Sequence, residues 1–456
     1  MSDPLDLAKN TARSLAYSLL PRVLNGAIDA TRIFADDTLR VGVTGLSRAG
    51  KTAFITSIAA NLLARDHPRF TLAPMGASEI ARFDHPAHLA ALAADPPLWP
   101  ARTDQVSLLA LNVRVSRGSI LPAKNIRLEF LDYPGEWLLD LPLLTQSFSQ
   151  WSQATLRRLQ SPALAPMARD FLAFAQGLPH AAAADENLAQ AGFALFKKTL
   201  LEARKAGFSF LQPGRHLMPA PGASPSYIAF FPLPSSGGLA TLLAGRYDAY
   251  VEAVRRDLAS PMFANVDRLI VLADLLSALH DGKDAFDDAR AALAAAAGAL
   301  RFDFDWLSAI SAMAQLRRPP RIISRIAFAA TKADHVGERQ RSNLKNLMHA
   351  LTKIENSEVT PEYFAIASMR CTQDYVHNLQ GRPVSAVRGV IAGSHQPHAS
   401  FPGEIPDRPP GDDFWAHPFL ALPDFIPMRL PEGGRLGVPN IGLEELLRFI
   451  LPDVLS

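Results

Sequence analysis

Residues 45–52 read GLSRAGKT and fit the pattern G-x-x-x-x-G-K-[ST], which is typical of loops that hold the phosphates of a nucleoside triphosphate. The glycines let the backbone wrap closely, so its N–H groups can point at phosphate oxygens. In this pattern Lys51 places a positive charge at the β and γ phosphates, and Thr52 offers its hydroxyl to Mg²⁺. The residues predicted to contact the phosphates are Gly45, Ser47, Arg48, Ala49, Gly50, Lys51, Thr52 and Ala53.

The segments on either side of this loop predict a suitable local setting. Leu39–Thr44 is an apolar stretch of strand type, and Thr52–Leu63 has helical composition. The helix would present the positive end of its dipole to the phosphates. A chance match to so short a pattern is the alternative, and the flanking elements argue against it.

A second candidate element is the DYPG sequence at residues 132–135, which follows an alternating, strand-like stretch. An aspartate in the position of Asp132 can hold Mg²⁺ through water, and the N–H of Gly135 can bind the γ-phosphate. Thr103 precedes the strand pair that leads to Asp132, where a threonine can sense Mg²⁺ and the γ-phosphate. Ordinary turn and loop roles are the alternatives, so both assignments depend on the phosphate loop.

The sequence TKAD at residues 331–334 directly follows an apolar, strand-like stretch. The carboxylate of Asp334 can accept from both N1–H and N2–H₂ of guanine, whereas the edge of adenine offers one donor beside an acceptor. The stem of Lys332 can lie on the face of the base, and the small loop at Ser368 can bring its backbone close to it. The alternative is a helix start capped by Thr331 or Asp334. Together the motifs predict GTP or GDP with Mg²⁺ as ligands.

The spacing of the motifs predicts the architecture. The gaps between Lys51, Asp132 and Asp334 are longer than the roughly 30 residues of a βαβ unit. In the longer gap, between Asp132 and Asp334, the alternation of strands and helices gives way to helical periodicity over 156–178 and 186–206. We predict an α/β P-loop NTPase fold of the GTPase type: a doubly wound sheet with a large, mainly helical inserted domain and a C-terminal loop-rich extension.

Five units follow from this prediction. They are an N-terminal helical segment (1–37), the first part of the P-loop domain (38–140), the inserted domain (141–265), the second part of the P-loop domain (266–394), and a proline-rich extension with a final helix (395–456). Asn440 is expected to cap that helix, whose Leu443, Leu446, Leu447 and Ile450 share one face.

Composition limits the other classes of function. The formal net charge of +2 over 456 residues gives no field that favours nucleic acid or anionic lipid. No stretch reaches the ~18 to 20 uninterrupted apolar residues of a membrane span, and the N-terminus lacks a secretory pattern. The single cysteine, Cys371, is expected to be a small buried apolar residue. We therefore expect a cytoplasmic protein without a membrane span or nucleic-acid partner; peripheral membrane contact is compatible with the composition, and the protein partner is unknown.

Several longer stretches resemble the YcjX-like family of bacterial P-loop GTPases, and the resemblance covers nearly the whole chain. These stretches are Val43–Thr56, Trp99–Pro100, Asp132–Asp140, Gln212–Arg215, Ala329–Val336 and Pro402–Glu404. The resemblance implies a cytosolic protein that binds and hydrolyses GTP and is linked to a stress response. It implies no particular downstream partner.

The predicted catalytic residues are Lys51, Glu136 and Arg48. Many GTPases carry a water-orienting glutamine where this chain has Glu136, whose charge beside the γ-phosphate leads us to expect slow hydrolysis. Arg48 and Arg215 are candidates for offsetting transition-state charge, with surface positions as the alternative for both. Two other functions stay open: a nucleotide-stabilised scaffold with negligible turnover, which Glu136 favours, and an ATP-binding P-loop protein, which Asp334 disfavours.

Overall fold

The computed structural model describes the chain from Thr38 to Leu455 with several gaps. The described residues are 38–64, 70–72, 80–101, 106–115, 123–218, 229–234, 236–258, 266–301, 323–353, 360–379, 381–394, 396–417 and 422–455. The predicted N-terminal helical segment, 1–37, and the predicted switch residue Thr103 lie outside them.

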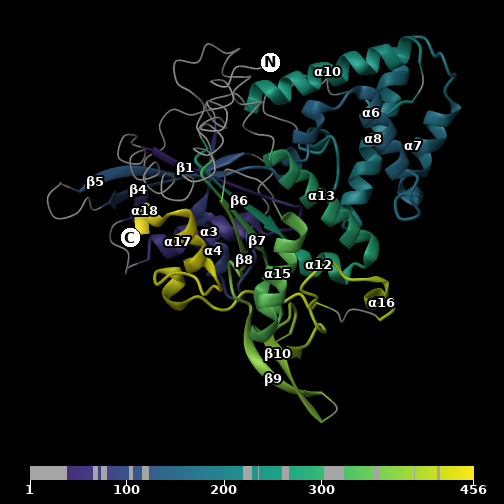
Figure 1. The fold of residues 1–456 in the computed structure, drawn as a ribbon. Coiled ribbons are helices and arrows are strands. Elements are labelled where there is room, and N and C mark those ends of the chain that lie inside the picture. The colour runs from purple at the N-terminus through teal and green to yellow at the C-terminus, as the bar shows by residue number, and fades with distance from the viewer. Residues whose placement is uncertain are drawn as a thin grey trace, which may run out of the picture.

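A mainly parallel sheet forms the centre of the molecule (Figure 1). Its strands lie in the order β2-β4-β5-β1-β6-β7-β8, with β3 beside β4. The pairs β5–β1, β1–β6, β6–β7 and β7–β8 are parallel, whereas β4 runs antiparallel to β5. This mixed α/β sheet is consistent with a P-loop NTPase-like fold. The strand bounds are β1 Thr38–Gly45, β2 Phe70–Leu72, β3 Ala81–Arg82, β4 Ser107–Val115, β5 Lys124–Asp132, β6 Arg268–Ala273, β7 Arg325–Ala330 and β8 Thr360–Ala365.

Helices cover both faces of this sheet. On one face lie α3 (Lys51–Leu62), α17 (Leu443–Ile450) and α18 (Pro452–Leu455), with α4 (His85–Leu92) packed on α3. On the other face lie α12 (Leu275–His280), α13 (Lys283–Arg301) and α15 (Arg341–Thr352). Strand β6 shows why both faces are covered: Ile270 and Leu272 enter the first core, while Leu269 and Val271 enter the second.

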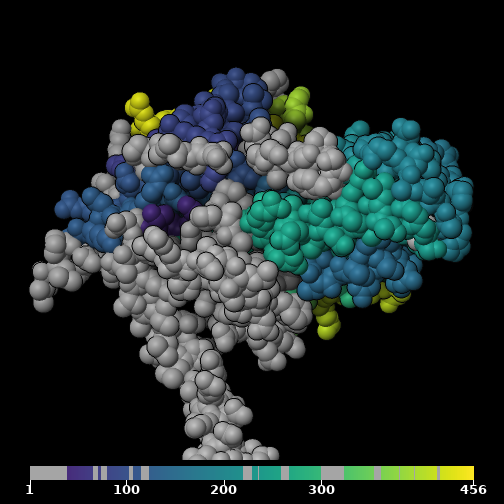
Figure 2. All heavy atoms as spheres, turned by 90° about the horizontal axis from the view of Figure 1, so that it is seen from above, coloured from purple at the N-terminus to yellow at the C-terminus, as the bar shows by residue number. Residues whose placement is uncertain are grey.

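Between β5 and β6 the chain forms a helical lobe to one side of the sheet (Figure 1, Figure 2). Aromatic rings pack around Trp151 in a core of its own. The periodicity over 156–178 predicted one helix, but the chain forms two, because Pro162 cannot continue the first and Pro166 suits the first turn of the second. The lobe contains η1 Leu141–Thr145, α6 Phe148–Leu159, α7 Ala165–Gly177, α8 Glu186–Lys205, η2 Gly214–His216 and α10 Gly238–Leu258, and α5 Gly135–Leu138 leads into it. Among the described helices, none is long and apolar enough to cross a bilayer.

A three-stranded antiparallel ribbon projects from the sheet domain after β8 (Figure 1). Its strands are β9 Thr372–Leu379, β10 Arg382–Val390 and β11 Pro397–Ser400. The sequence patterns did not predict it, because polar residues such as Gln373 and Asp374 and the proline at 383 interrupt the alternation that marks a strand.

The proline-rich segment that follows contains α16 (Asp412–Trp415) and η5 (Pro431–Gly434) before the last helices. The four apolar residues predicted to share a face of the final helix are buried in α17. The predicted cap at Asn440 is wrong: α17 begins after Gly442, which adopts a left-handed conformation (φ 71°), and the side-chain amide of Asn440 donates to the carbonyl of Val438.

Arg268 of β6 ties the C-terminal helices to the centre of the sheet. Its side chain is 1% exposed and lies 2.6 Å, from Nη2 to Oδ2, from Asp453, while Nη1 donates to the carbonyl of Ile450. A buried guanidinium needs such partners, because burying an unpaired charge is costly. The contacts therefore hold α17 and α18 over the face of the sheet that also carries α3.

We expect Asp453→Ala to lower the free energy of unfolding by about 2–4 kcal/mol, because it leaves the buried charge of Arg268 without its carboxylate. The control is Glu444→Ala in α17, which removes an exposed pair with Arg448 and is expected to cost less than about 1 kcal/mol. Denaturant unfolding followed by circular dichroism measures both. Equal losses for the two variants would contradict the anchoring role of Arg268.

Candidate functional site

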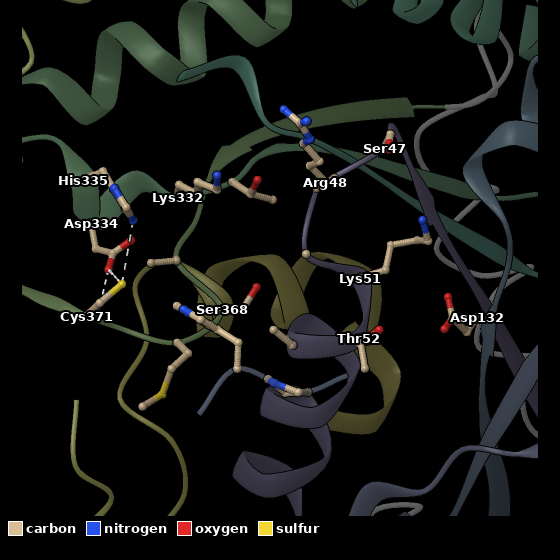
Figure 3. A pocket seen from close by; sticks show the side chains of 18 of the residues that line it. Ser47, Arg48, Lys51, Thr52, Asp132, Lys332, Asp334, His335, Ser368 and Cys371 are labelled. Atoms are coloured by element: carbon tan, nitrogen blue, oxygen red, sulfur yellow. Dashed lines mark hydrogen bonds between the residues drawn. The ribbon is translucent and has the colours of Figure 1, made fainter. Parts of the chain in front are cut away.

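A cavity of 390 Å³ lies at the carboxyl ends of β1, β5, β7 and β8, a position and size typical of ligand sites in open α/β sheets. Figure 3 shows Lys51, Thr52 and Asp132 towards one end and Lys332, Asp334 and Cys371 towards the other. The lining residues are Ser47–Ala53, Trp99, Pro100, Asp132, Pro134, Glu136, Met218, Thr331, Lys332, Asp334, His335, Ala367, Ser368, Met369 and Cys371. The predicted site residues therefore meet in one place, apart from Gly45 and Gly135, which do not line the cavity, and Thr103, which is not described.

The loop between β1 and α3 forms the first end of the cavity. Gly50 adopts a left-handed conformation (φ 77°) immediately before Lys51 begins the 12-residue helix α3. This turn suits glycine, which carries no Cβ to clash there. The ammonium of Lys51 lies 3.5 Å from the carbonyl oxygen of Gly45 and thus folds back over the loop. The arrangement places a lysine and a helix N-terminus at one position, which favours an anion.

Gly45 and Gly135 form the wall behind this loop. A Cβ on Gly135 would lie 1.6 Å from the carbonyl oxygen of Gly45, and a Cβ on Gly45 would lie 2.3 Å from that of Leu272. Only glycine fits at either position, because real Cβ atoms do not approach a backbone so closely. The DYPG segment is therefore packed directly against the phosphate-loop motif.

Two carboxylates, Asp132 and Glu136, face the cavity near Lys51. Both side chains are almost fully buried, and Asp132 pairs in register with Val43 of β1 at the end of β5. Burial raises the pKa of Asp132 to about 6; the charge of Lys51 opposes this rise, and that of Glu136 adds to it. A cation bound nearby would favour the ionised form of Asp132, so this end of the cavity suits an anion that brings its own metal ion.

Arg48 lies at the rim of the cavity and points away from Lys51 (Figure 3). Its backbone is left-handed (φ 67°). Its Nη2 donates to the carbonyl of Lys205 over 3.1 Å, and its Nη1 lies 3.7 Å from Oδ2 of Asp281. The guanidinium thus bridges the loop to the end of α8 and the residue after α12.

The second end of the cavity is built by the turn after β7. Lys332 is left-handed (φ 60°), and its ammonium lies 2.6 Å from Oδ2 of Asp274 and 3.0 Å from Oγ of Ser277. The short helix η3 (Ala333–His335) follows, with no side-chain cap, so the alternative role of Thr331 or Asp334 as a cap does not hold. These contacts hold the ammonium of Lys332 in place. Lys332 and Asp334 both line the cavity.

Asp334 is 1% exposed and is held by the segment that enters the ribbon. Its Oδ2 accepts from the backbone N–H of Cys371 over 2.8 Å and from the thiol of Cys371 over 3.0 Å, while Thr372 Oγ1 donates to its backbone carbonyl. Its Oδ1 accepts no hydrogen bond from any described residue. One carboxylate oxygen is therefore fixed by the protein, and the other stays available to a ligand.

Cys371 has a polar role that the sequence did not predict. The expected burial is right, and Val387 and Phe425 pack against it. Burial and the adjacent Asp334 carboxylate hold the pKa of the Cys371 thiol well above its usual value, so the thiol stays protonated and donates. Burial also lowers the pKa of His335, whose Nε2 lies 3.8 Å from the sulfur.

Other lining residues were also missed. Met218 reaches the cavity from the helical lobe. Asp274, which does not line the cavity, holds Lys332 from its position directly after β6. No local pattern marks either residue, since each role depends on a contact between distant segments. Ser368 lines the cavity as a half-buried residue after β8, where the sequence placed it.

Arg215, a candidate for charge compensation, does not line the cavity. Its side chain is 4% exposed; Nη1 lies 2.5 Å from Oδ2 of Asp257, Nε lies 4.0 Å from Asp140, and the guanidinium stacks 4.7 Å above the ring of Trp137. These contacts hold it in the seam between α5 and the lobe. It cannot reach a phosphate in this arrangement, and it is not a surface residue either.

The same interface contains contacts between the Gln212–Arg215 turn and the segment formed by α5 and the two residues after it. The N–H of Gly214 donates to Oδ1 of Asp140 over 2.7 Å, and the side chain of Gln212 donates to the carbonyl of Leu139 over 2.5 Å. A Cβ on Gly214 would lie 1.9 Å from the carbonyl oxygen of Glu136. We call these contacts of Gln212 and Gly214 the lobe clamp. They join the helical lobe to Glu136, which lines the cavity.

Residues 39–455 match the YcjX-like family, DUF463. The chain is 32% identical over 459 residues to a protein of Escherichia coli strain K12 named Ras-like GTPase YcjX, an alignment that covers 92% of this chain and 96% of that protein. A protein of the same name from Shewanella oneidensis strain MR-1 is 32% identical over 478 residues, with 92% of this chain and 96% of the relative covered. By this family match and these two relatives, the chain belongs to the YcjX-like family.

Proposed function

We propose that this protein binds a guanine nucleotide together with Mg²⁺ and hydrolyses GTP to GDP. The observation that carries the proposal is one cavity with Lys51 at one end and the half-satisfied carboxylate of Asp334 at the other. A nucleoside triphosphate has matching polarity, with anionic phosphates at one end and hydrogen-bond donors on the base at the other. Both relatives are named Ras-like GTPases, which supports the same function here.

At the phosphate end, the backbone of residues 47–53 would cradle the phosphates, and Lys51 would neutralise charge on the β and γ groups. Thr52 would bind Mg²⁺ directly and Asp132 through water. The N–H of Gly135 would meet the γ-phosphate. Because Gly135 does not line the cavity in this structure, the contact requires a shift of the DYPG segment.

At the base end, the two oxygens of the Asp334 carboxylate would accept from N1–H and N2–H₂ of guanine, including the Oδ1 that no described residue uses. The stem of Lys332 would lie along the base, since Asp274 holds its ammonium at 2.6 Å. The backbone at Ser368 would contact the rim of the base. An adenine in this position would leave the carboxylate facing an acceptor, which argues against the ATP-binding alternative.

Catalysis would depend on Glu136 to hold the attacking water and on Lys51 with Mg²⁺ to offset charge. Arg48 could add to this only after leaving its contacts with Lys205 and Asp281. Thr103 is proposed as the residue that senses Mg²⁺ and the γ-phosphate.

We further propose that residues 141–265 form an inserted domain that reports the state of the nucleotide. A shift of Gly135 and Glu136 towards a γ-phosphate would pull on the lobe clamp, because the Gln212–Arg215 turn is bonded to the end of α5. The protein would then act as a molecular switch, with the stress response implied by the family resemblance as its setting.

We expect Lys51→Ala to weaken GTP and GDP binding by at least about 100-fold, because the phosphates lose a half-buried cationic partner. Isothermal titration with each nucleotide measures the loss, and circular dichroism checks that the variant is folded. The matched control is Lys198→Ala in α8, which removes a half-exposed lysine outside the cavity and should leave binding unchanged. Unaltered GTP binding by folded Lys51→Ala would contradict the phosphate-loop assignment.

We expect Asp334→Asn to shift preference from guanine towards xanthine, because an amide can complement the second keto group of that base. The loss of GTP affinity should be roughly 10⁴-fold, as for other sites whose buried polar partner goes unmatched. Asp281→Asn, which changes a carboxylate beside Arg48 but outside the lining of the cavity, is the control and should keep guanine preference. Competition titrations with GTP, XTP and ATP measure the order of their affinities. An unchanged order for Asp334→Asn would show that other residues recognise the base.

We expect slow GTP hydrolysis. In Glu136→Ala its rate should fall by at least about tenfold, because the carboxylate that positions the attacking water is lost. Single-turnover hydrolysis with Mg²⁺ measures the rate. Arg48→Ala is the comparison and should lose less, since its guanidinium is bonded to Lys205 and not directed at Lys51. If the unmutated protein binds GTP but shows no turnover in this assay, the scaffold alternative holds and the catalytic assignment fails.

A further inference from the structure

Asp334, His335 and Cys371 form a cluster of metal-ligating side chains at the base end of the cavity (Figure 3). We propose that this cluster binds Zn²⁺ and that the bound ion competes with the guanine base. The competition rests on the proposed function, because the Asp334 carboxylate is the group that both ligands would use. The metal site itself rests only on the geometry of the three side chains.

The distances suit a small tetrahedral ion. Sγ of Cys371 lies 3.0 Å from Oδ2 of Asp334 and 3.8 Å from Nε2 of His335, and the three ligand atoms lie within 4.8 Å of one another. Tetrahedral zinc bonds to sulfur, nitrogen and oxygen imply ligand separations of roughly 3.4–3.6 Å. Side-chain rotations that change these separations by up to roughly 1.5 Å would therefore complete three bonds to one ion.

The surrounding structure holds the three ligands in place. Asp334 and His335 are adjacent in η3, and the backbone N–H of Cys371 is bonded to Asp334. The imidazole of His335 packs edge-on against Phe425, 5.5 Å between ring centroids, and Phe425 also packs against Cys371. The cluster is thus preformed, and little ordering would be needed on binding.

The charge around the cluster does not oppose a cation. The nearby ammonium of Lys332 is paired with Asp274 at 2.6 Å. The thiol of Cys371 would give its proton to solvent as the sulfur–metal bond forms, and the hydrogen bond from sulfur to Oδ2 would be replaced by two bonds to the ion. Sulfur and imidazole nitrogen favour Zn²⁺ over the hard ion Mg²⁺. The fourth position would face the cavity and hold water, because all three ligand residues line it.

The chain offers an unusually direct test, since Cys371 is the single cysteine among its 456 residues. Any thiolate-to-metal charge-transfer band of the Co²⁺-loaded, full-length protein must come from this residue. We expect such a band in nucleotide-free protein, its removal by added Zn²⁺, and its absence in Cys371→Ser. His335→Gln should lower Zn²⁺ affinity, measured against a chromophoric chelator, by at least about tenfold. A folded unmutated protein without the band would overturn the metal site.

A second measurement separates this inference from the proposed function. Binding of fluorescent GDP with Mg²⁺ is titrated with and without Zn²⁺, in unmutated protein and in Cys371→Ser. We expect Zn²⁺ to weaken GDP binding only where Cys371 is present. GDP binding without any cobalt band would overturn the metal site and leave the nucleotide function intact. A cobalt band that saturating GDP does not diminish would overturn the competition and, with it, the assignment of Asp334 to guanine.

Discussion

Three stretches of backbone meet at the end of β1 without a side chain between them, and the geometry of the site depends on this contact. Gly135 lies against the carbonyl of Gly45, and Gly45 lies against that of Leu272, each too close for a Cβ. In an interior packed in this way no soft side chain can absorb a movement, so neighbouring segments transmit it. A shift of the DYPG segment would therefore act directly on the backbone of the phosphate loop and, through it, on β6.

The same kind of contact continues into the helical lobe. Gly214 lies against the carbonyl of Glu136, again too close for a Cβ, and the carboxylate of Asp140 accepts from the N–H of Gly214. Arg215 then fills the seam with a buried charge balanced by Asp140 and Asp257. A segment far along the chain is in this way coupled to the cavity through main-chain atoms, which suits the transfer of small displacements.

The sequence predicted those parts of the site that are local. The phosphate loop and the turn at Asp334 are short patterns in which glycine, lysine and a carboxylate stand at characteristic positions, and both line the cavity. Contacts between distant segments could not be predicted. The sequence predicted Cys371 to be an apolar residue, because its hydrogen bond to Asp334 joins distant segments. It left Arg215 open as an exposed or a catalytic arginine, because no local pattern indicates that Asp257 lies beside it. The ribbon was missed for a related reason: its strands are stabilised by one another and not by an apolar pattern of their own.

The anchoring of α17 by Arg268 has a consequence for how the protein is made. Strands β1 and β5 and helix α3 leave the ribosome early, yet the apolar face that they share is covered by a helix from the end of the described chain. Until α17 and α18 arrive, this face lacks the part of its cover that they supply, and the buried guanidinium lacks its acceptors. Contacts so distant in sequence form slowly, and exposed apolar strands invite aggregation in the meantime. Newly synthesised chains thus pass through an interval in which β1, α3 and β5 are present but their shared face is incompletely covered, and chaperones that shield apolar strands would act in that interval.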